Sequence, residues 1–146
     1  MASIRKETLI DAGLDKVWSA LRDVSALHTR LVPGFVVDTK LEGDSRIVTF
    51  GNGLVARERI ITVDDDARRV VWSVVGGRFT HHNGSAQVFD EGGRTRFVWI
   101  ADLLPNEIAG DIAGMIEMGT AVSTGPSRTT RSISPARHRK LRATIV

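Results

Sequence analysis

Glu58 and His82 are the two side chains of this sequence whose chemistry best suits a binding cavity. A carboxylate and an imidazole held in one apolar cavity act as an acid–base pair that moves a proton beside a substrate carbonyl. The same groups can orient the polar end of a ligand that is bound without reaction. Glu58 stands between Arg57 and Arg59, however, and a glutamate among charged residues is typical of a solvated strand face. On the sequence alone both interpretations of Glu58 remain open.

The His81-His82-Asn83 segment carries the ligand types of a metal site without the required spacing. Neighbouring residues of a strand point to opposite faces, so the two imidazoles cannot readily meet one ion. The chain has 0 cysteines, which excludes disulfides, thiolate metal sites and cysteine nucleophiles. His28 and His138 belong to no motif, and neither a G-x-S-x-G elbow nor a phosphate-binding glycine loop is present. We therefore expect no metal and no cofactor.

Turn residues recur along the middle of the chain at intervals of roughly ten residues, the spacing of an antiparallel meander. The strongest turn signal is Gly51-Asn52-Gly53, because Asn and Gly tolerate positive φ. Stretches rich in β-branched and aromatic residues lie between the turns. We expect strands over 3–10, 35–41, 46–50, 54–63, 69–75, 79–89 and 94–104.

Three helices are expected around these strands. Apolar residues at helical spacing predict a short amphipathic helix over 14–22. A second short helix is expected over 24–30, with Asp23 as its N-cap and Pro33-Gly34 at its end. A longer helix is expected over 106–122, again from the spacing of its apolar residues.

This order of elements predicts an α+β protein in which a long helix covers one face of a curved antiparallel sheet. Gly110, Gly114 and Gly119 each cost about 1 kcal/mol relative to Ala inside that helix. They either allow close approach of the sheet or leave room for a ligand. The alternative is that the helix simply tolerates small residues there.

Charge is distributed unevenly along the chain. The formal net charge is +3, with 20 Lys and Arg against 17 Asp and Glu. Residues 123–146 hold six of the basic side chains and no acidic one, which leaves 14 basic and 17 acidic residues, a net charge of −3, in 1–122. An acidic body does not favour specific nucleic-acid binding. No apolar run reaches the roughly 18 residues needed to span a bilayer, so we expect no stable membrane insertion. The composition, with 0 cysteines, suits a cytoplasmic protein.

The composition changes abruptly after Val122. Residues 123–146 are rich in Ser, Thr, Arg and Pro and lack apolar periodicity, so they cannot bury enough surface to offset their ordering entropy. We expect one domain over 1–122, followed by a basic and irregular tail over 123–146. That tail is either genuine or the product of a reading-frame change in a GC-rich gene.

The first third of the chain carries the residues of a family resemblance. Ile10-Asp11-Ala12, Val17-Trp18 and Leu21-Arg22-Asp23 have the types and spacing found at the start of the START/SRPBCC superfamily, and Pro33-Gly34 stands where that superfamily commonly has the same pair. The sequence therefore resembles plant pathogenesis-related allergens and bacterial polyketide cyclase/dehydrase-like proteins over about residues 3–122. The resemblance implies a helix-grip fold, in which a curved antiparallel sheet wraps around a long C-terminal helix.

A narrower stretch is similar to plant abscisic-acid receptors. Glu58-Arg59-Ile60, Asp64-Asp65 and the segment 73–77 carry this likeness. The receptors follow their double glycine with a His-Arg-Leu latch, where this chain has Arg78-Phe79-Thr80. Their proline-containing gate is replaced here by the segment 51–54. A hormone-receptor role is therefore not expected.

The receptor likeness places Glu58 on the cavity side of its strand, and period-two alternation extends that assignment to the neighbouring strands. The residues expected to point inward are Ala56, Glu58, Ile60, Thr62, Val70, Trp72, Val74, Thr80, His82, Gly84, Ala86, Val88, Val98, Ile100 and Asp102. A slip of one residue in register would invert the assignment for a whole strand. The ligand-binding residues expected from this set and from the long helix are Ala56, Glu58, Ile60, Trp72, Val74, His82, Ala86, Val98, Ile100, Ile112 and Met115.

The resemblance implies binding or transport of a small hydrophobic molecule, such as a lipid, isoprenoid, polyketide or aromatic metabolite. The alternative is a polyketide cyclase/dehydratase-type enzyme that uses Glu58 and His82 as an acid–base pair, because the superfamily contains both kinds of protein. A third hypothesis is an interaction protein whose basic tail binds acidic partners. A homodimer remains open beside a monomer.

Overall fold

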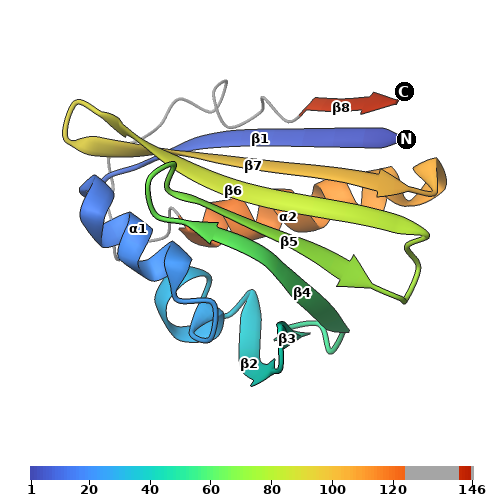
Figure 1. The fold of residues 1–146 in the computed structure, drawn as a ribbon. Helices are drawn as coiled ribbons and strands as arrows, with labels where there is room; N and C mark the ends of the chain where they lie inside the picture. The colour runs from blue at the N-terminus through green and yellow to red at the C-terminus, as the bar shows by residue number, and fades with distance from the viewer. Residues whose placement is uncertain (124–141, 146) are drawn as a thin grey trace.

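The computed structural model describes residues 1–123 and 142–145 of the chain. The elements follow the order β1 (Ala2–Ile10), α1 (Leu14–Arg22), η1 (Leu27–Leu31), β2 (Val36–Glu42), β3 (Ser45–Phe50), β4 (Val55–Asp64), β5 (Arg69–Val75), β6 (His81–Glu91), β7 (Arg94–Leu104), η2 (Asn106–Ile108), α2 (Ala109–Ser123) and β8 (Arg142–Ile145). The strands form one antiparallel sheet in the order β2-β3-β4-β5-β6-β7-β1-β8 (Figure 1). The predicted α+β helix-grip architecture is confirmed.

The register of the sheet is set by its short turns. Between β6 and β7, Gly92 and Gly93 adopt φ angles of 64° and 85°, and Glu91 pairs with Arg94. A two-residue turn with positive φ at both positions matches the twist of a hairpin, and glycine adopts it without steric cost. This turn fixes which residues of β7 share a face with which residues of β6.

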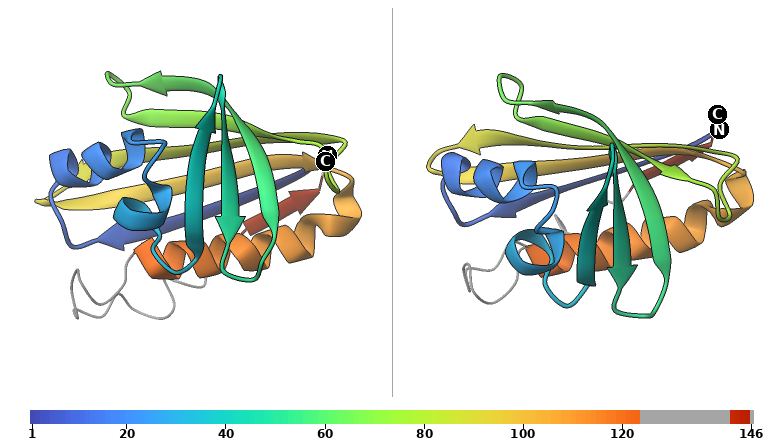
Figure 2. Two further views of the ribbon diagram at one scale, coloured as in Figure 1. Left: turned by 90° about the horizontal axis from the view of Figure 1, so that it is seen from below. Right: turned by 60° about the horizontal axis from the view of Figure 1, so that its bottom comes forward.

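The long helix α2 lies along the concave face of the sheet, and the sheet curls so that β2 and β3 also approach it (Figure 2). Lys6 of β1 is only 1% exposed, and its ammonium lies 3.2 Å from the Glu117 carboxylate on α2. Within residues 1–123, two buried apolar clusters form the core, one beside α1 and η1 and the other beneath α2. Trp99 packs against both clusters and therefore lies where the two meet.

The second short helix differs from its prediction. It is a π-helix over Leu27–Leu31, and its N-cap is Ala26 with no side-chain cap hydrogen bond. The Asp23 carboxylate instead accepts hydrogen bonds from the Ser25 hydroxyl at 2.8 Å and the Arg30 guanidinium at 3.0 Å. The predicted N-cap at Asp23 is wrong because the helix begins at Leu27 and not at residue 24.

The C-terminal part of the chain also departs from the expected irregular tail. Strand β8 pairs antiparallel with β1, with Ala2 opposite Ile145, so the two ends of the chain lie side by side (Figure 1). A sheet edge presents unpaired backbone N–H and C=O groups, and β8 satisfies part of that edge on β1. The irregular structure predicted over 123–146 is therefore wrong for 142–145, and Ser123 belongs to α2. Residues 124–141 and 146 lie outside the described part of the chain.

Candidate ligand pocket

A cavity of about 280 Å³ lies between the inner face of the sheet and α2. Its size is close to the lower end of the range for small-molecule sites, roughly 300–1,000 Å³. Most of the side chains around it are apolar, and Trp72 and Ile112 both contribute to its wall, as predicted. At its rim Leu54, Val55 and Val75 are more than 45% exposed, with values of 55%, 62% and 47%.

Most of the expected ligand-binding residues line this cavity. They are Ala56 and Glu58 on β4, Trp72 and Val74 on β5, His82 and Ala86 on β6, and Ile112 and Met115 on α2. Of the other residues expected to point inward, Val70 also lines the cavity, Val88 lies in the core, and Gly84 lies against the Trp72 ring. Their location is thus established, whereas a role in binding stays a prediction.

The inward assignment is wrong for β7. Trp99 is the partner of Ala86 and Ala101 that of Gly84, so Trp99 and Ala101 point inward with Phe97. Val98, Ile100 and Asp102 have the opposite parity, and Val98 and Ile100 border a hollow on the outer face. The signal that reveals this parity is Glu91-Gly92-Gly93-Arg94, because a two-residue turn pairs even-numbered with odd-numbered residues.

The inward assignment also fails for Thr62 and Thr80, and Ile60 lies beside the cavity without lining it. The β4–β5 register shifts between Ile60 and Thr62, and this bulge turns Thr62 to the exposed outer face opposite Val71. Ile60 keeps its inward direction but packs against the core cluster beside α1 and does not line the cavity. Thr80 is exposed in the loop before β6.

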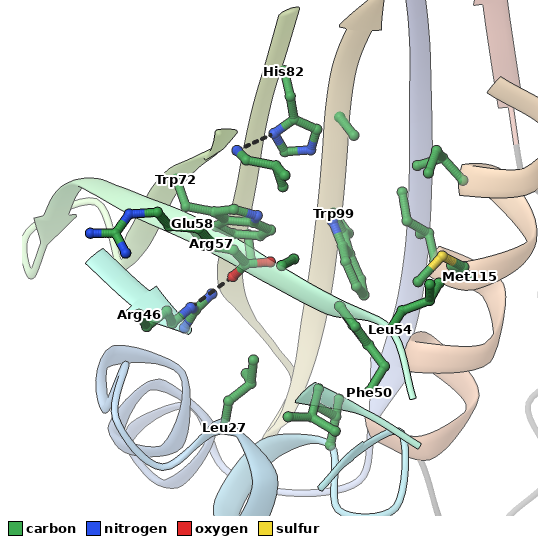
Figure 3. Close-up of a pocket in the computed structure, with 18 of the residues that line it drawn as sticks. Leu27, Arg46, Phe50, Leu54, Arg57, Glu58, Trp72, His82, Trp99 and Met115 are labelled. Carbon is green, nitrogen blue, oxygen red and sulfur yellow. Dashed lines mark hydrogen bonds and ion pairs between the residues drawn. The ribbon is translucent and has the colours of Figure 1, made fainter. Parts of the chain in front are cut away.

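Glu58 lies in a buried ion pair and not on a solvated face. Its side chain is 9% exposed, and its Oε1 atom accepts a hydrogen bond from the Arg46 Nε at 2.8 Å (Figure 3). Arg46 also donates to the Val24 carbonyl at 3.4 Å, and its guanidinium carbon lies 5.6 Å from the centre of the Trp72 ring. A guanidinium over an indole face gains cation–π attraction. Glu58 is therefore a charged group with a fixed counter-ion.

Sequence reasoning missed Arg46. The residue lies in the short β3 strand, and no local pattern indicates its direction. Its role follows from strand pairing, because Arg46 is the direct cross-strand partner of Glu58. Opposite charges at such positions are a recognised source of sheet stability, so the pairing of β3 with β4 is the signal that finds it.

His82 is held as a neutral imidazole. Its Nδ1 accepts a hydrogen bond from the Val74 backbone N–H at 3.0 Å, so the ring proton lies on Nε2 (Figure 3). Burial is the largest cause that lowers the pKa of His82, to about 4, with a further contribution from His81, while Asp102 acts in the opposite direction. Within the described chain no group accepts a hydrogen bond from Nε2, so this N–H can serve a ligand in the cavity.

Aromatic rings form the wall between these polar groups. The Trp72 and Trp99 rings meet edge to face, with centroids 6.2 Å apart, and Phe79 meets the His82 ring at 4.9 Å. Such walls favour flat apolar molecules, because aromatic contacts add to the energy of apolar burial. The pocket thus combines an apolar interior with a carboxylate from β4 and an N–H donor from β6.

Two further features of the described residues bear on function. Over the ranges 1–123 and 142–145, no group of three or more His, Cys, Asp or Glu side chains is placed to hold a metal ion. In the same ranges, no helix has the length and apolar character needed to cross a membrane.

Comparison with known proteins gives a family and a fold. Among curated proteins none matches this chain. Solved structures with the same fold include the protein XoxI from Bacillus cereus, with 21% identity, a TM-score of 0.74, and coverage of 84% of this chain and 94% of that one. A START superfamily protein from Mycobacterium smegmatis has 12% identity, a TM-score of 0.64, and coverage of 82% and 94%. Ginseng major latex-like protein 151 from Panax ginseng has 18% identity, a TM-score of 0.68, and coverage of 81% and 91%.

The family model described as "Polyketide cyclase / dehydrase and lipid transport" matches residues 1–125, which span all the pocket-lining residues. The match covers most of the chain, including the helix-grip fold and the cavity under α2, and it shows that the chain belongs to that family.

Proposed function

We propose that this protein binds and carries a small hydrophobic molecule in the cavity between the sheet and α2. The observation that supports the proposal most is the composition of the wall: aromatic and aliphatic side chains from several elements surround about 280 Å³, with few polar groups among them. Burial of apolar surface contributes roughly 25 cal/mol per Å² removed from water, which is the main driving force for such a ligand. The family description, which includes lipid transport, is in agreement with this class of ligand.

The two polar groups suggest how the ligand is oriented. The Nε2–H of His82 is suited to a carbonyl, ether or hydroxyl oxygen, because a neutral imidazole with Nδ1 occupied donates through Nε2. The Oε2 atom of Glu58 accepts no hydrogen bond from any described residue and is suited to a ligand hydroxyl. We therefore favour a flat apolar body with an oxygen-bearing polar end. Lipids, isoprenoids, polyketides and aromatic metabolites all include such molecules.

The electrostatics of the site favour binding over acid–base catalysis. With a pKa of about 4, His82 holds almost no proton at pH 7 and is a weak base. The Oε1 atom of Glu58 is already engaged by the Arg46 Nε at 2.8 Å. A cyclase/dehydratase activity that relies on these two side chains is the alternative, and it predicts turnover.

A titration with 2-naphthol, followed by its fluorescence, tests the proposal. The wild-type protein should bind this hydroxyarene, and His82→Ala should weaken binding about fivefold, since one hydrogen bond is worth about 1 kcal/mol. His81→Ala is the matched control, because His81 is exposed and does not line the cavity. Equal affinities for all three proteins, or no binding by the wild type, would contradict the proposal.

The same proteins separate carrier from enzyme. Incubation of the wild type and Glu58→Gln with linear poly-β-ketone substrates should give no more cyclised product than a protein-free control, while Glu58→Gln binds 2-naphthol more weakly. Turnover by the wild type that Glu58→Gln abolishes would support the enzymatic alternative.

A further inference from the structure

The Trp72 ring packs against β6 at a residue that has no side chain. Its cross-strand partner on β6 is Gly84. A Cβ atom at Gly84 would lie 2.8 Å from Cε2, 2.9 Å from Nε1 and 3.0 Å from Cζ2 of the indole. Real Cβ atoms almost never make contacts this short, so any side chain at position 84 must displace the ring from β6. The ring lines the cavity and has the Arg46 guanidinium beside it, so its displacement changes the shape of the pocket wall.

Trp99 has the same relation to α2. A Cβ atom at Gly119 would lie 2.9 Å from Cζ3 and 3.2 Å from Cη2 of the Trp99 ring, and 3.0 Å from Cε2 of Phe35. Trp99 and Phe35 both line the cavity. Gly119 therefore lets the helix approach the sheet while these rings keep their places in the wall.

The other glycines of α2 have a different setting. A Cβ atom at Gly110 or Gly114 would meet nothing within 4 Å. The packing of α2 therefore requires glycine at position 119 but not at positions 110 and 114. Gly114 provides a substitution of the same kind, in the same helix, that leaves the pocket wall untouched.

We propose that Gly84 and Gly119 are specificity-determining residues: by holding Trp72 and Trp99 back against β6 and α2, they set the largest ring system that the pocket admits. The proposal rests on the proposed ligand binding and adds a size limit to it. The two rings already meet edge to face at 6.2 Å, so a small displacement of either narrows the space beside them. Neither glycine contacts a ligand through a side chain, and both act by positioning an aromatic neighbour.

The test compares two fluorescent hydroxyarenes of different size, 2-naphthol and 1-hydroxypyrene. For each probe, the dissociation constants of the wild type and of Gly114→Ala should agree within about twofold. Gly84→Ala and Gly119→Ala should weaken the binding of 1-hydroxypyrene at least tenfold and the binding of 2-naphthol less than threefold. A loss of equal size for both probes would overturn the proposal, because a general loss of structure does not depend on ligand size.

A double variant keeps the test independent of misfolding. Trp72→Leu removes the indole atoms that a Cβ at position 84 would strike. Adding Gly84→Ala to Trp72→Leu should therefore lower neither the melting temperature nor the affinity for 1-hydroxypyrene any further. An equal loss in both backgrounds would show that Gly84 acts without Trp72, and the proposal would be wrong.

The same variants separate failure of this proposal from failure of ligand binding. If the wild type binds neither probe, the proposed function fails, and the melting temperatures then test only the packing contact between positions 72 and 84. Coupling between positions 72 and 84 would still support the packing on which the limit depends. Absence of both binding and coupling would overturn both proposals.

Discussion

Arg46, Glu58 and His82 decide the polarity of an otherwise apolar pocket. Each occupies a buried position where an unpaired charge would be costly, and each has a fixed partner within the fold. Arg46 and Glu58 neutralise one another, while His82 stays uncharged. The buried part of the pocket consequently offers hydrogen-bonding groups without a net charge, as a neutral hydrophobic ligand requires, while the exposed Arg57 and Arg78 pair with Glu42 and Asp111.

The ion pair predicts a large asymmetry between single and double substitutions. Arg46→Met leaves Glu58 buried without its counter-ion, and loss of one partner of a buried pair costs about 3–5 kcal/mol. The double variant Arg46→Met/Glu58→Gln should recover most of that loss. Urea unfolding measures both free energies, and Arg57→Met is the control, because the Arg57–Glu42 pair is exposed and such pairs are worth about 1 kcal/mol or less. An Arg46→Met cost no larger than that of the control would count against the buried pair.

His82 predicts how stability depends on pH. Its pKa is about 4 in the folded chain and 6.5 as the ordinary value, so the unfolded state binds the proton first as the pH falls. The folded chain should therefore keep its full stability above pH 6.5 and lose on the order of 3 kcal/mol between pH 6.5 and pH 4. Urea unfolding at pH 7 and pH 4.5 should give a smaller difference for His82→Gln than for wild type. His81→Gln should keep most of the wild-type difference, because burial is the largest cause of the lowered pKa of His82 and His81 only adds to it. A wild-type pH dependence in His82→Gln would refute the assignment.

At the scale of elements, the meander and the helices could be predicted because their signals are local. Turn residues mark the ends of the strands, and apolar spacing marks α1 and α2. The register of β7 was misassigned because alternation alone fixes two faces without saying which is inner. The bulge between Ile60 and Thr62 has no local signal, since it arises from pairing with β5. Asp23 is not the cap because the short helix begins three residues later than predicted, at Leu27.

The register of β7 makes opposite predictions for neighbouring residues. Trp99→Leu should weaken 2-naphthol binding several-fold, because an indole that lines the cavity is lost. Ile100→Ala should leave the dissociation constant unchanged, because Ile100 lies on the outer face. Fluorescence titration of the two variants measures both effects. The reverse order of effects would mean that the sequence-based parity was correct after all.

For the molecule as a whole, the order of the elements and a few residues near the N-terminus predict the fold and the family. They do not predict the structure of the C-terminal residues 142–145. Composition predicted an irregular tail, yet residues 142–145 form a strand on β1. Composition describes what a segment can bury, but pairing at a sheet edge needs only backbone groups, so almost any short segment can form it.

Removal of the residues after Ser123 tests how the tail contributes. The truncated chain should change from a net charge of +3 to −3 and lose retention on heparin, because the removed residues hold six basic side chains. Its melting temperature should fall only modestly, since β8 is 4 residues long and lies at the sheet edge. Binding of 2-naphthol should persist. Heparin retention in the truncated chain would place the basic surface elsewhere.

The measurement that tests the central claim most directly is native mass spectrometry of the protein purified from its own host. The account predicts a species heavier than the chain by the mass of one small apolar molecule. Organic extraction should remove this molecule, and His82→Ala should retain less of it than the wild type does. A wild-type spectrum that contains only the bare chain, from preparations that also fail to take up added 2-naphthol, would contradict it.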